Sequence, residues 1–291
     1  MSRVVVCTIV RGRRQHLRNL LVGLARQSTA PDRVVVAVMG GPDVTRAADG
    51  LGLPLTWVDA ASATSDLPLA AARNTARKAA PDATRLIFLD VDIIPSRGLV
   101  ADYVACLKTT DAVWSGHVDY LPPGAPKDDL DESDLAAVGQ PHPARPRPTA
   151  PGRLSRPELF WSLSFALSAA SFDRVAGFDP AFTGYGAEDT DFALRVAAAQ
   201  IPLLQTPSAA GWHQHHDSVT PPVNHLLDIV ANAHTFRQRW GRWPMEGWLT
   251  EFEARGWVRW TPSCHLLQVT DSGMAACRGV EPPRTPSGVG R

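Results

Sequence analysis

Apolar runs and helical stripes alternate along the first 118 residues of this 291-residue chain. Residues 4–10 (VVVCTIV) are continuously apolar, which is typical of a parallel strand buried on both faces. Residues 16–25 carry leucines at the spacing of one helix face. The same two patterns predict strands at 34–39, 55–58, 86–89 and 112–118 and helices at 70–80 and 99–107. This alternation predicts an α/β fold in which helices cover both faces of a mostly parallel sheet.

Residues 121–157 interrupt the alternation. They contain DDLDESD and then PHPARPRPTAP, which holds too much proline for the interior of a helix or strand. We interpret the segment as a long mobile loop over the active face, and an interdomain linker is the alternative. Regular structure is expected again at 160–168, 188–199, 203–205, 226–240 and 245–255, and the tail after about residue 270 is expected to be disordered.

Composition narrows the class of protein. Hydrophobic residues make up 44% of the chain and charged residues 20%, as in soluble globular proteins. The 29 basic and 29 acidic side chains balance, so no global field attracts nucleic acid or anionic lipid, and nucleic acid is not an expected partner. Four cysteines without CxxC spacing indicate reduced thiols in a cytoplasmic protein. No signal peptide or membrane-spanning segment is expected, because the apolar runs are too short.

Residues 177–195 (GFDPAFTGYGAEDTDFALR) carry the most informative chemistry. Glycines and a proline break the chain just ahead of Glu188, Asp189 and Asp191, which open a predicted helix. Three carboxylates within four residues repel one another, but the unpaired N–H groups and the macrodipole of a helix N-terminus favour negative charge. Such a site can hold an ionised carboxylate directed into a cleft, as a general base requires.

Asp90 and Asp92 end the apolar run LIFLDVD. A strand that ends in two carboxylates places them at the carboxyl edge of the sheet, where open α/β sheets bind ligands. Their spacing puts them on the same side of an extended segment, where they repel unless a cation or a proton lies between them. A divalent metal carrying a diphosphate satisfies that requirement. A turn or cap after the strand is the alternative, and it is the commoner one for an isolated Asp-x-Asp.

Three histidines lie within WHQHH at residues 212–216. We expect one of His213, His215 and His216 to be a metal ligand, whereas proton shuttles or a polar loop are the alternatives. An imidazole beside carboxylate and phosphate oxygens suits Mn²⁺ better than Mg²⁺. A zinc hydrolase is a further alternative, but the sequence contains no HExxH to support it.

Arginines flank two of the predicted elements. Arg11, Arg13 and Arg14 follow the first strand, and Arg73 opens the helix after LPLAAA. Arginines at such positions can hold a diphosphate or stack on a base, and a solvated basic turn is the alternative, most of all for Arg14. Neither GxGxxG nor GxxxxGK[ST] occurs, which disfavours a dinucleotide-binding or P-loop enzyme.

Taken in order, VVVCTIVRGR, LPLAAARNTA, LIFLDVD, GFDPAFTGYGAEDTDFALR and WHQHH resemble the GT-A fold glycosyltransferases. The sequence is similar in particular to bacterial family-two enzymes with a galactosyltransferase-type C-terminal segment. The resemblance covers about residues 3–216 and, more loosely, NAHTFRQRWGRWPMEGW. It implies a Rossmann-like GT-A domain at 1–218, with a nucleotide-sugar-binding half at 1–118 and an acceptor and catalytic half at 159–218, a helical extension at 219–262 and a disordered tail at 263–291.

The resemblance also implies residue roles. Asp189 would be the catalytic base with Glu188 beside it, and Glu188 and Asp191 would bind acceptor or donor hydroxyls. The metal ligands would be Asp92, His213 and Asp90, of which Asp90 lies nearer the ribose or the metal. The implied donor contacts are Thr8, Val10, Arg11, Arg73, Asp90 and Asp92. The implied acceptor or sugar contacts are Tyr185, Gly186, Asp191 and Trp212, with Gly184 and Gly186 allowing close approach of the backbone.

The implied reaction moves a sugar from a nucleotide-sugar donor, UDP-linked by family default, to an acceptor hydroxyl with inversion of configuration. Mn²⁺ or Mg²⁺ would assist, and the acceptor would be a glycan, a lipid-linked molecule or a small molecule. A lipid-linked acceptor would allow peripheral membrane contact. The alternatives are a nucleotidyltransferase of similar α/β fold, which would release pyrophosphate, a metal hydrolase, which would release free sugar, and a non-catalytic sugar-binding module.

Overall fold

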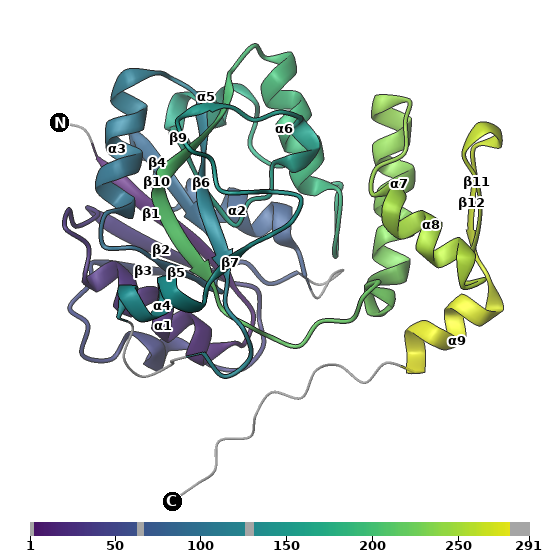
Figure 1. The fold of residues 1–291 in the computed structure, drawn as a ribbon, viewed down its shortest axis with the longest axis horizontal. Coiled ribbons are helices and arrows are strands. Elements are labelled where there is room, and N and C mark those ends of the chain that lie inside the picture. The colour runs from purple at the N-terminus through teal and green to yellow at the C-terminus, as the bar shows by residue number, and fades with distance from the viewer. Residues whose placement is uncertain (1–2, 63–66, 126–130, 280–291) are drawn as a thin grey trace, which may run out of the picture. The chain divides into compact units, whose positions relative to one another are not determined.

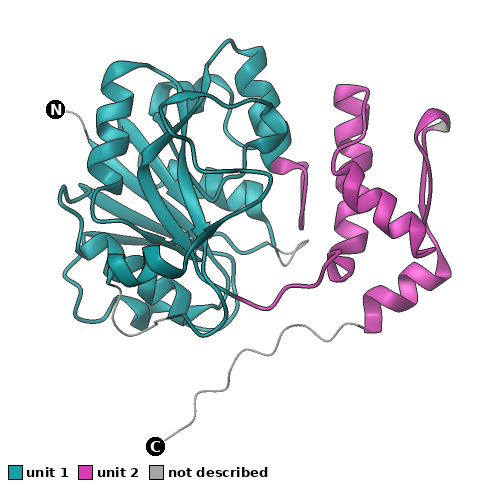
Figure 2. Ribbon diagram, in the orientation of Figure 1, with its two compact units in different colours: residues 1–179, 189–215 teal, residues 180–188, 216–291 magenta. Residues whose placement is uncertain are grey.

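The computed structural model describes residues 3–62, 67–125 and 131–279 (Figure 1). Within them the chain divides into two compact units (Figure 2). The first unit comprises residues 1–179 and 189–215, and the second comprises residues 180–188 and 216–291. The short segment 180–188 therefore leaves the first unit and belongs to the second, although the chain on both sides of it is part of the first.

The first unit is built on a ten-stranded sheet. Its main strand order is β3-β2-β1-β4-β9-β6-β10-β5, with β7 added beside β6 and β8 beside β10. Pairs β1–β2, β2–β3, β1–β4 and β6–β10 are parallel, whereas β9 is antiparallel to both of its neighbours. The strands are β1 (Val4–Val10), β2 (Arg33–Val38), β3 (Leu55–Asp59), β4 (Arg85–Leu89), β5 (Ile93–Pro95), β6 (Val113–Tyr120), β7 (Gln140–Pro141), β8 (Gly152–Arg153), β9 (Ser164–Ser168) and β10 (Leu203–His213).

Helices cover both faces of this sheet, which confirms the predicted fold class. Alternate residues of β1 show why: Val5 and Cys7 join one apolar cluster with α2, α5 and α6, whereas Val4 and Val6 join the other with α1 and α3. A strand buried on both faces must be apolar throughout, as β1 is. The helices are α1 (Arg14–Ala25), α2 (Leu69–Lys78), α3 (Leu99–Thr109), α4 (Glu132–Val138), α5 (Ala169–Arg174) and α6 (Glu188–Ala198), with short 3-10 turns η1 (Thr45–Ala48) and η2 (Pro157–Leu159).

Strand β10 is much longer than the predicted strand at 203–205. It continues to His213 because a register shift against β6, between Gln205 and Ala210, accommodates the irregular stretch that contains Pro207. Trp212 and His213 therefore lie within the strand and not in a loop beyond it. His213 is paired with Tyr120 of β6 and with Ile93 of β5.

Residues 121–157 are also more regular than the predicted loop. In the described part of this segment, α4 precedes two short strands, and each of these strands pairs with the central sheet. The proline-rich stretch thus runs from one sheet contact at β7 to the next at β8. Residues 126–130 lie outside the described part of the chain.

The second unit has its own apolar core, formed by Leu226, Ile229, Leu249 and Phe252 among others. Its elements are η3 (Val223–His225), α7 (Leu226–Trp240), α8 (Glu246–Ala254), β11 (Val258–Thr261), η4 (Pro262–Cys264), β12 (Leu266–Val269) and α9 (Asp271–Gly279). Strand β12 and helix α9 occupy part of the tail that was expected to be disordered, and residues 280–291 lie outside the described chain. Over the described residues, no helix combines the length and the apolar character that crossing a bilayer requires.

Candidate functional site

Two arginines hold the aspartates that follow β4. The N–H of Ile93 donates to the carbonyl oxygen of Asp90 (3.0 Å), and this turn leaves both carboxylates at the carboxyl end of the strand. Arg73 on α2 donates from Nη2 to Oδ1 of Asp90 (3.0 Å). Arg13, the residue before α1, donates from Nη1 to Oδ2 of Asp92 (2.7 Å). The predicted position of the two aspartates at the sheet edge is therefore the observed one.

Electrostatics tie these aspartates to the acidic motif of α6. The pKa of Asp90 is raised to about 6, mainly because burial penalises its charged form. The charge of Arg73 opposes this rise, whereas the neighbouring charges of Asp92 and Asp189 add to it. Three carboxylates from two distant motifs thus lie close enough to influence one another, within the first unit.

Asp189, in the first turn of α6, has one oxygen fixed and one available. Oδ2 accepts a hydrogen bond from the backbone N–H of Ser162 (2.9 Å). Oδ1 is buried and accepts no hydrogen bond from the described residues, and Nη1 of Arg73 lies 3.9 Å from it. The Arg73 side chain is only 4% exposed and lies between Asp90 and Asp189. An oriented carboxylate with one available oxygen is what a general base needs.

The third predicted component, an imidazole, also reaches this site. Nε2 of His213, at the end of β10, lies 3.5 Å from Oδ2 of Asp92. The His213 ring stacks on Tyr120 with a centroid distance of 4.7 Å, which fixes its orientation. A carboxylate oxygen and an imidazole nitrogen at this separation fit two ligands of one divalent cation, and the mixed donor set suits Mn²⁺. The backbone oxygen of His215 contacts His16 instead (3.3 Å).

Several predicted contact residues are engaged elsewhere in the first unit. Asp191 is fully buried, and its Oδ2 accepts from Nε of Arg195 (2.7 Å). Trp212 is 6% exposed and packs in an apolar cluster with Ile94, Leu121 and Leu135. The side chains of Thr8 and Val10 are buried in β1, while Arg11 is half-buried just beyond it. Core packing thus accounts for Trp212, and an ion pair accounts for Asp191.

The loop that precedes Asp189 belongs to the second unit, with Tyr185, Gly186 and Glu188. Nδ2 of Asn232 on α7 donates to the carbonyl oxygens of Thr183 (2.8 Å) and Gly186 (2.9 Å). The ring of Tyr185 stacks on His225 at 4.7 Å. One side chain of α7 therefore fixes the backbone of the motif.

Close packing explains the two glycines of this loop. Both have positive φ values, 68° at Gly184 and 101° at Gly186. A Cβ at Gly184 would lie 2.1 Å from Cγ of Asp228, and one at Gly186 would lie 2.7 Å from Sδ of Met245. Contacts within the second unit thus leave no room for a side chain at either position.

Two residues that the structure places at the site, Arg13 and Ser162, are not among those to which the resemblance gives a role. Arg13 reaches Asp92 because Gly12 and Arg13 both have positive φ values, 60° and 50°, which turns the chain sharply before α1. Ser162 binds Asp189 through its backbone, so its side chain carries no signal of this contact. The sequence offered one clue for Arg13, namely its place directly after the first strand.

Sequence comparison finds known proteins that are similar to the part of the chain that contains Asp189 and His213. Residues 152–216 match the family model described as the N-terminal domain of galactosyltransferase. Validoxylamine A glucosyltransferase from Streptomyces hygroscopicus subsp. jinggangensis (strain 5008) is 41% identical over 85 residues, which cover 29% of this chain and 20% of the relative. The protein of the same name from Streptomyces hygroscopicus subsp. limoneus is 36% identical over 85 residues, covering 29% and 18%. The matched region thus spans a fifth or less of each relative.

Solved structures extend the likeness to most of the chain. GalNAc-T7 with UDP, GalNAc and Mn²⁺ aligns with a TM-score of 0.57 and 14% identity over 87% of this chain and 57% of that one. Mannosyltransferase PcManGT from Pyrobaculum calidifontis, in complex with GDP-Man and Mn²⁺, aligns with a TM-score of 0.56 and 19% identity over 83% and 66%. The fold is that of the GT-A glycosyltransferases, which confirms the resemblance inferred from the motifs.

Proposed function

We propose that this chain is a metal-dependent, inverting glycosyltransferase that moves a hexosyl group from a nucleotide-sugar, with UDP as the favoured nucleotide, to an acceptor hydroxyl. The observation that carries the proposal is the convergence of Asp92 and Asp189 on Asp90. Arg73 contacts Asp90 and Asp189, and His213 lies 3.5 Å from Asp92. The names of the similar proteins support it, because they include a glucosyltransferase and complexes with UDP or GDP-Man and Mn²⁺.

Asp92 and His213 are the residues that would hold the divalent cation. When bound, the cation would act as a Lewis acid that offsets the charge growing on the departing diphosphate. Arg13 contacts the same oxygen of Asp92 and adds a second positive charge beside the diphosphate. Asp90, bound by Arg73, would contact the ribose or the cation.

Asp189 is the proposed general base. The N–H of Ser162 fixes Oδ2, so Oδ1 takes the proton of the acceptor hydroxyl as its oxygen attacks the anomeric carbon. The anomeric carbon gains oxocarbenium character while its bond to the diphosphate oxygen breaks. Because the nucleophile enters opposite the leaving group, an α-linked donor gives a β-linked product. Arg73 contacts both Asp90 and Asp189 and is the residue that positions the base relative to the donor.

A donor and acceptor screen tests this function. The protein is incubated with Mn²⁺ and with UDP-glucose, UDP-galactose or GDP-mannose, and the acceptors include glycans, lipid-linked sugars and validoxylamine A. The expected result is acceptor-dependent release of the nucleoside diphosphate, with a β-linked product by NMR. Pyrophosphate release from a nucleoside triphosphate would support the nucleotidyltransferase alternative. Free sugar without any transfer product would support a hydrolase.

A further inference from the structure

A strap crosses the sheet of the first unit beside the candidate site. We use this name for residues 139–153, which pair with the sheet through β7 at one end and β8 at the other. Between these ends Arg147 forms an ion pair with the buried Asp119 of β6, and its Nε lies 3.1 Å from Nε2 of His117. The strap is therefore fixed to the sheet at three places.

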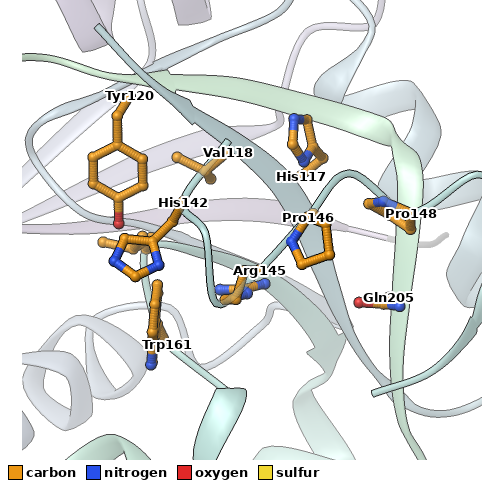
Figure 3. Close-up of a pocket in the computed structure, with 11 residues that line it drawn as sticks. His117, Val118, Tyr120, His142, Arg145, Pro146, Pro148, Trp161 and Gln205 are labelled. Carbon is orange, nitrogen blue, oxygen red and sulfur yellow. The ribbon is translucent and has the colours of Figure 1, made fainter. Parts of the chain in front are cut away.

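A pocket lies between the strap, β6 and the residues that precede β9. Figure 3 shows the rings of Tyr120, His142 and Trp161 on one side of Arg145 and His117 on the other. The ring of His142 meets Trp161 edge-on at 4.8 Å and lies 5.7 Å from Tyr120. The guanidinium carbon of Arg145 lies 5.3 Å from the centre of the Trp161 ring. Arg145 thus brings a guanidinium next to three aromatic rings in the lining of this pocket.

The guanidinium of Arg145 has no hydrogen-bond acceptor within the described chain. It is half-buried, and it lies against the ring of Trp161. Arg147, two residues further along the chain, differs because its guanidinium is paired with the carboxylate of Asp119. Burial lowers the pKa of Arg145, and burial together with the charge of Arg145 lowers the pKa of His142. A partly desolvated guanidinium with unused donors is suited to bind a carboxylate or a phosphate.

The pocket adjoins the proposed catalytic residues. Tyr120, which lines it, stacks on His213, and Trp161 directly precedes Ser162, whose N–H binds Asp189. The charge of Asp189 also acts on Arg145. A molecule in this pocket is therefore close to both the base and the proposed metal ligand.

We infer that Arg145 binds an anionic group, a phosphate or a carboxylate, of a substrate whose sugar ring packs on Trp161. This inference rests on the proposed glycosyltransferase function. The anion has two potential sources, namely the diphosphate of the donor and an acidic group on the acceptor. Both would form the same charge-assisted, bidentate contact with the guanidinium.

Binding measurements distinguish the two sources. Wild type, Arg145→Gln, Arg145→Lys and a control, Arg156→Gln, are titrated with UDP in the presence of Mn²⁺ by calorimetry. Arg156 is exposed and follows the strap, so the control removes an equal charge outside the pocket. Glucuronic acid and glucose 6-phosphate are compared with glucose by ligand-observed NMR. Circular dichroism and thermal unfolding verify that each variant is folded.

Weaker UDP binding by Arg145→Gln, by about tenfold or more, would assign the contact to the donor diphosphate. Unchanged UDP binding, together with loss of a wild-type preference for the acidic sugars over glucose, would assign it to the acceptor. Arg145→Lys keeps the charge and should lose less in either case, and it replaces the Gln variant if that variant does not fold.

An Arg145→Gln variant that matches wild type with every probe would overturn the inference. These binding measurements do not depend on turnover, so they can contradict the inference about Arg145 without contradicting the proposed function, and the reverse. Arg145-dependent anion binding without sugar transfer would count against the proposed function alone. Sugar transfer that is indifferent to Arg145 would count against this inference alone.

Discussion

Two aspartates in the first turn of α6, Asp189 and Asp191, lie in two different settings. Asp189 has one oxygen held by a backbone N–H, and its other oxygen accepts no hydrogen bond from the described residues. Asp191 is fully buried, and Arg195 binds it at 2.7 Å. Arg195 in turn donates to the carbonyl oxygens of Val175 and Gly177 (2.6 and 2.7 Å). The surroundings of Asp189 thus leave one carboxylate oxygen available, whereas those of Asp191 already pair its carboxylate with Arg195.

This difference separates a carboxylate that is available for the reaction from one that stabilises the fold. A buried charge without full compensation costs free energy, so a protein retains one where the charge has a use. A buried ion pair whose partners are both hydrogen-bonded needs no further ligand. We therefore expect changes around Asp189 to act on rate and changes around Asp191 to act on folding. The following experiments test that division, from the largest expected effect to the smallest.

Removal of divalent cations should abolish sugar transfer. The proposed ligands Asp92 and His213 would hold the ion that offsets the charge of the leaving diphosphate, and no other described group of the proposed mechanism replaces that Lewis acid. Activity is measured after dialysis against EDTA and again after addition of Mn²⁺ or Mg²⁺, with better recovery expected in Mn²⁺. Full turnover in chelator, with negligible metal by elemental analysis, would contradict the metal-dependent mechanism.

Asp189→Asn should lower kcat by roughly 10²–10⁴-fold, the range typical for removal of a general base. The amide keeps the shape of the carboxylate but cannot take the acceptor proton. UDP affinity, measured by calorimetry, should change little, because the donor contacts lie on other residues.

The matched control for this variant is Asp173→Asn. Asp173 is a 55%-exposed carboxylate on α5 that pairs with Arg77, so the same chemical change there should leave kcat within about twofold. Equal rates for Asp189→Asn and wild type would remove Asp189 from the mechanism.

Arg195→Met should destabilise the protein by about 3–5 kcal/mol, because it leaves the buried Asp191 carboxylate without its partner. Chemical denaturation measures the loss. The double variant Asp191→Asn, Arg195→Met should recover part of it, since the stranded charge is then removed as well. Identical stability of the single and double variants would show that the carbonyl contacts of Arg195, and not the ion pair, account for the loss.

Much of the first unit was predictable from local pattern. The continuous apolar run of β1 can only be a strand with both faces covered, and the carboxyl end of β4 had to place Asp90 and Asp92 at the sheet edge. The helix start at Glu188 was predictable for a similar reason, since glycines precede it and carboxylates occupy its first turn. These features depend on residues that are neighbours in the sequence.

Features that depend on distant partners were not predictable. Pro207 marks the end of a strand by local rules, yet β10 continues because β6 and β5 pair with it further on. A tryptophan can pack against a sugar ring or in an apolar core. Trp212 lies in a core because Leu135 and its neighbours, which are distant in the sequence, pack against it. The contact of Asp189 with the N–H of Ser162 leaves no trace in the sequence, because any non-proline residue can supply a backbone donor.

The smallest expected effect concerns the pH dependence of folding in the metal-free protein. The pKa of Asp90 is about 6 in the folded chain, compared with an ordinary value of 3.8. Between these two pH values the folded state therefore keeps a proton on Asp90 that the unfolded state has released. Its contribution to stability therefore falls as pH rises through that window, by at most roughly 1.4 kcal/mol per pH unit. Asp90→Asn removes this contribution, so the stability of wild type minus that of the variant should decline from pH 4 to 6 in EDTA and then level off. A difference that stays constant with pH would mean that Arg73 keeps Asp90 ionised throughout.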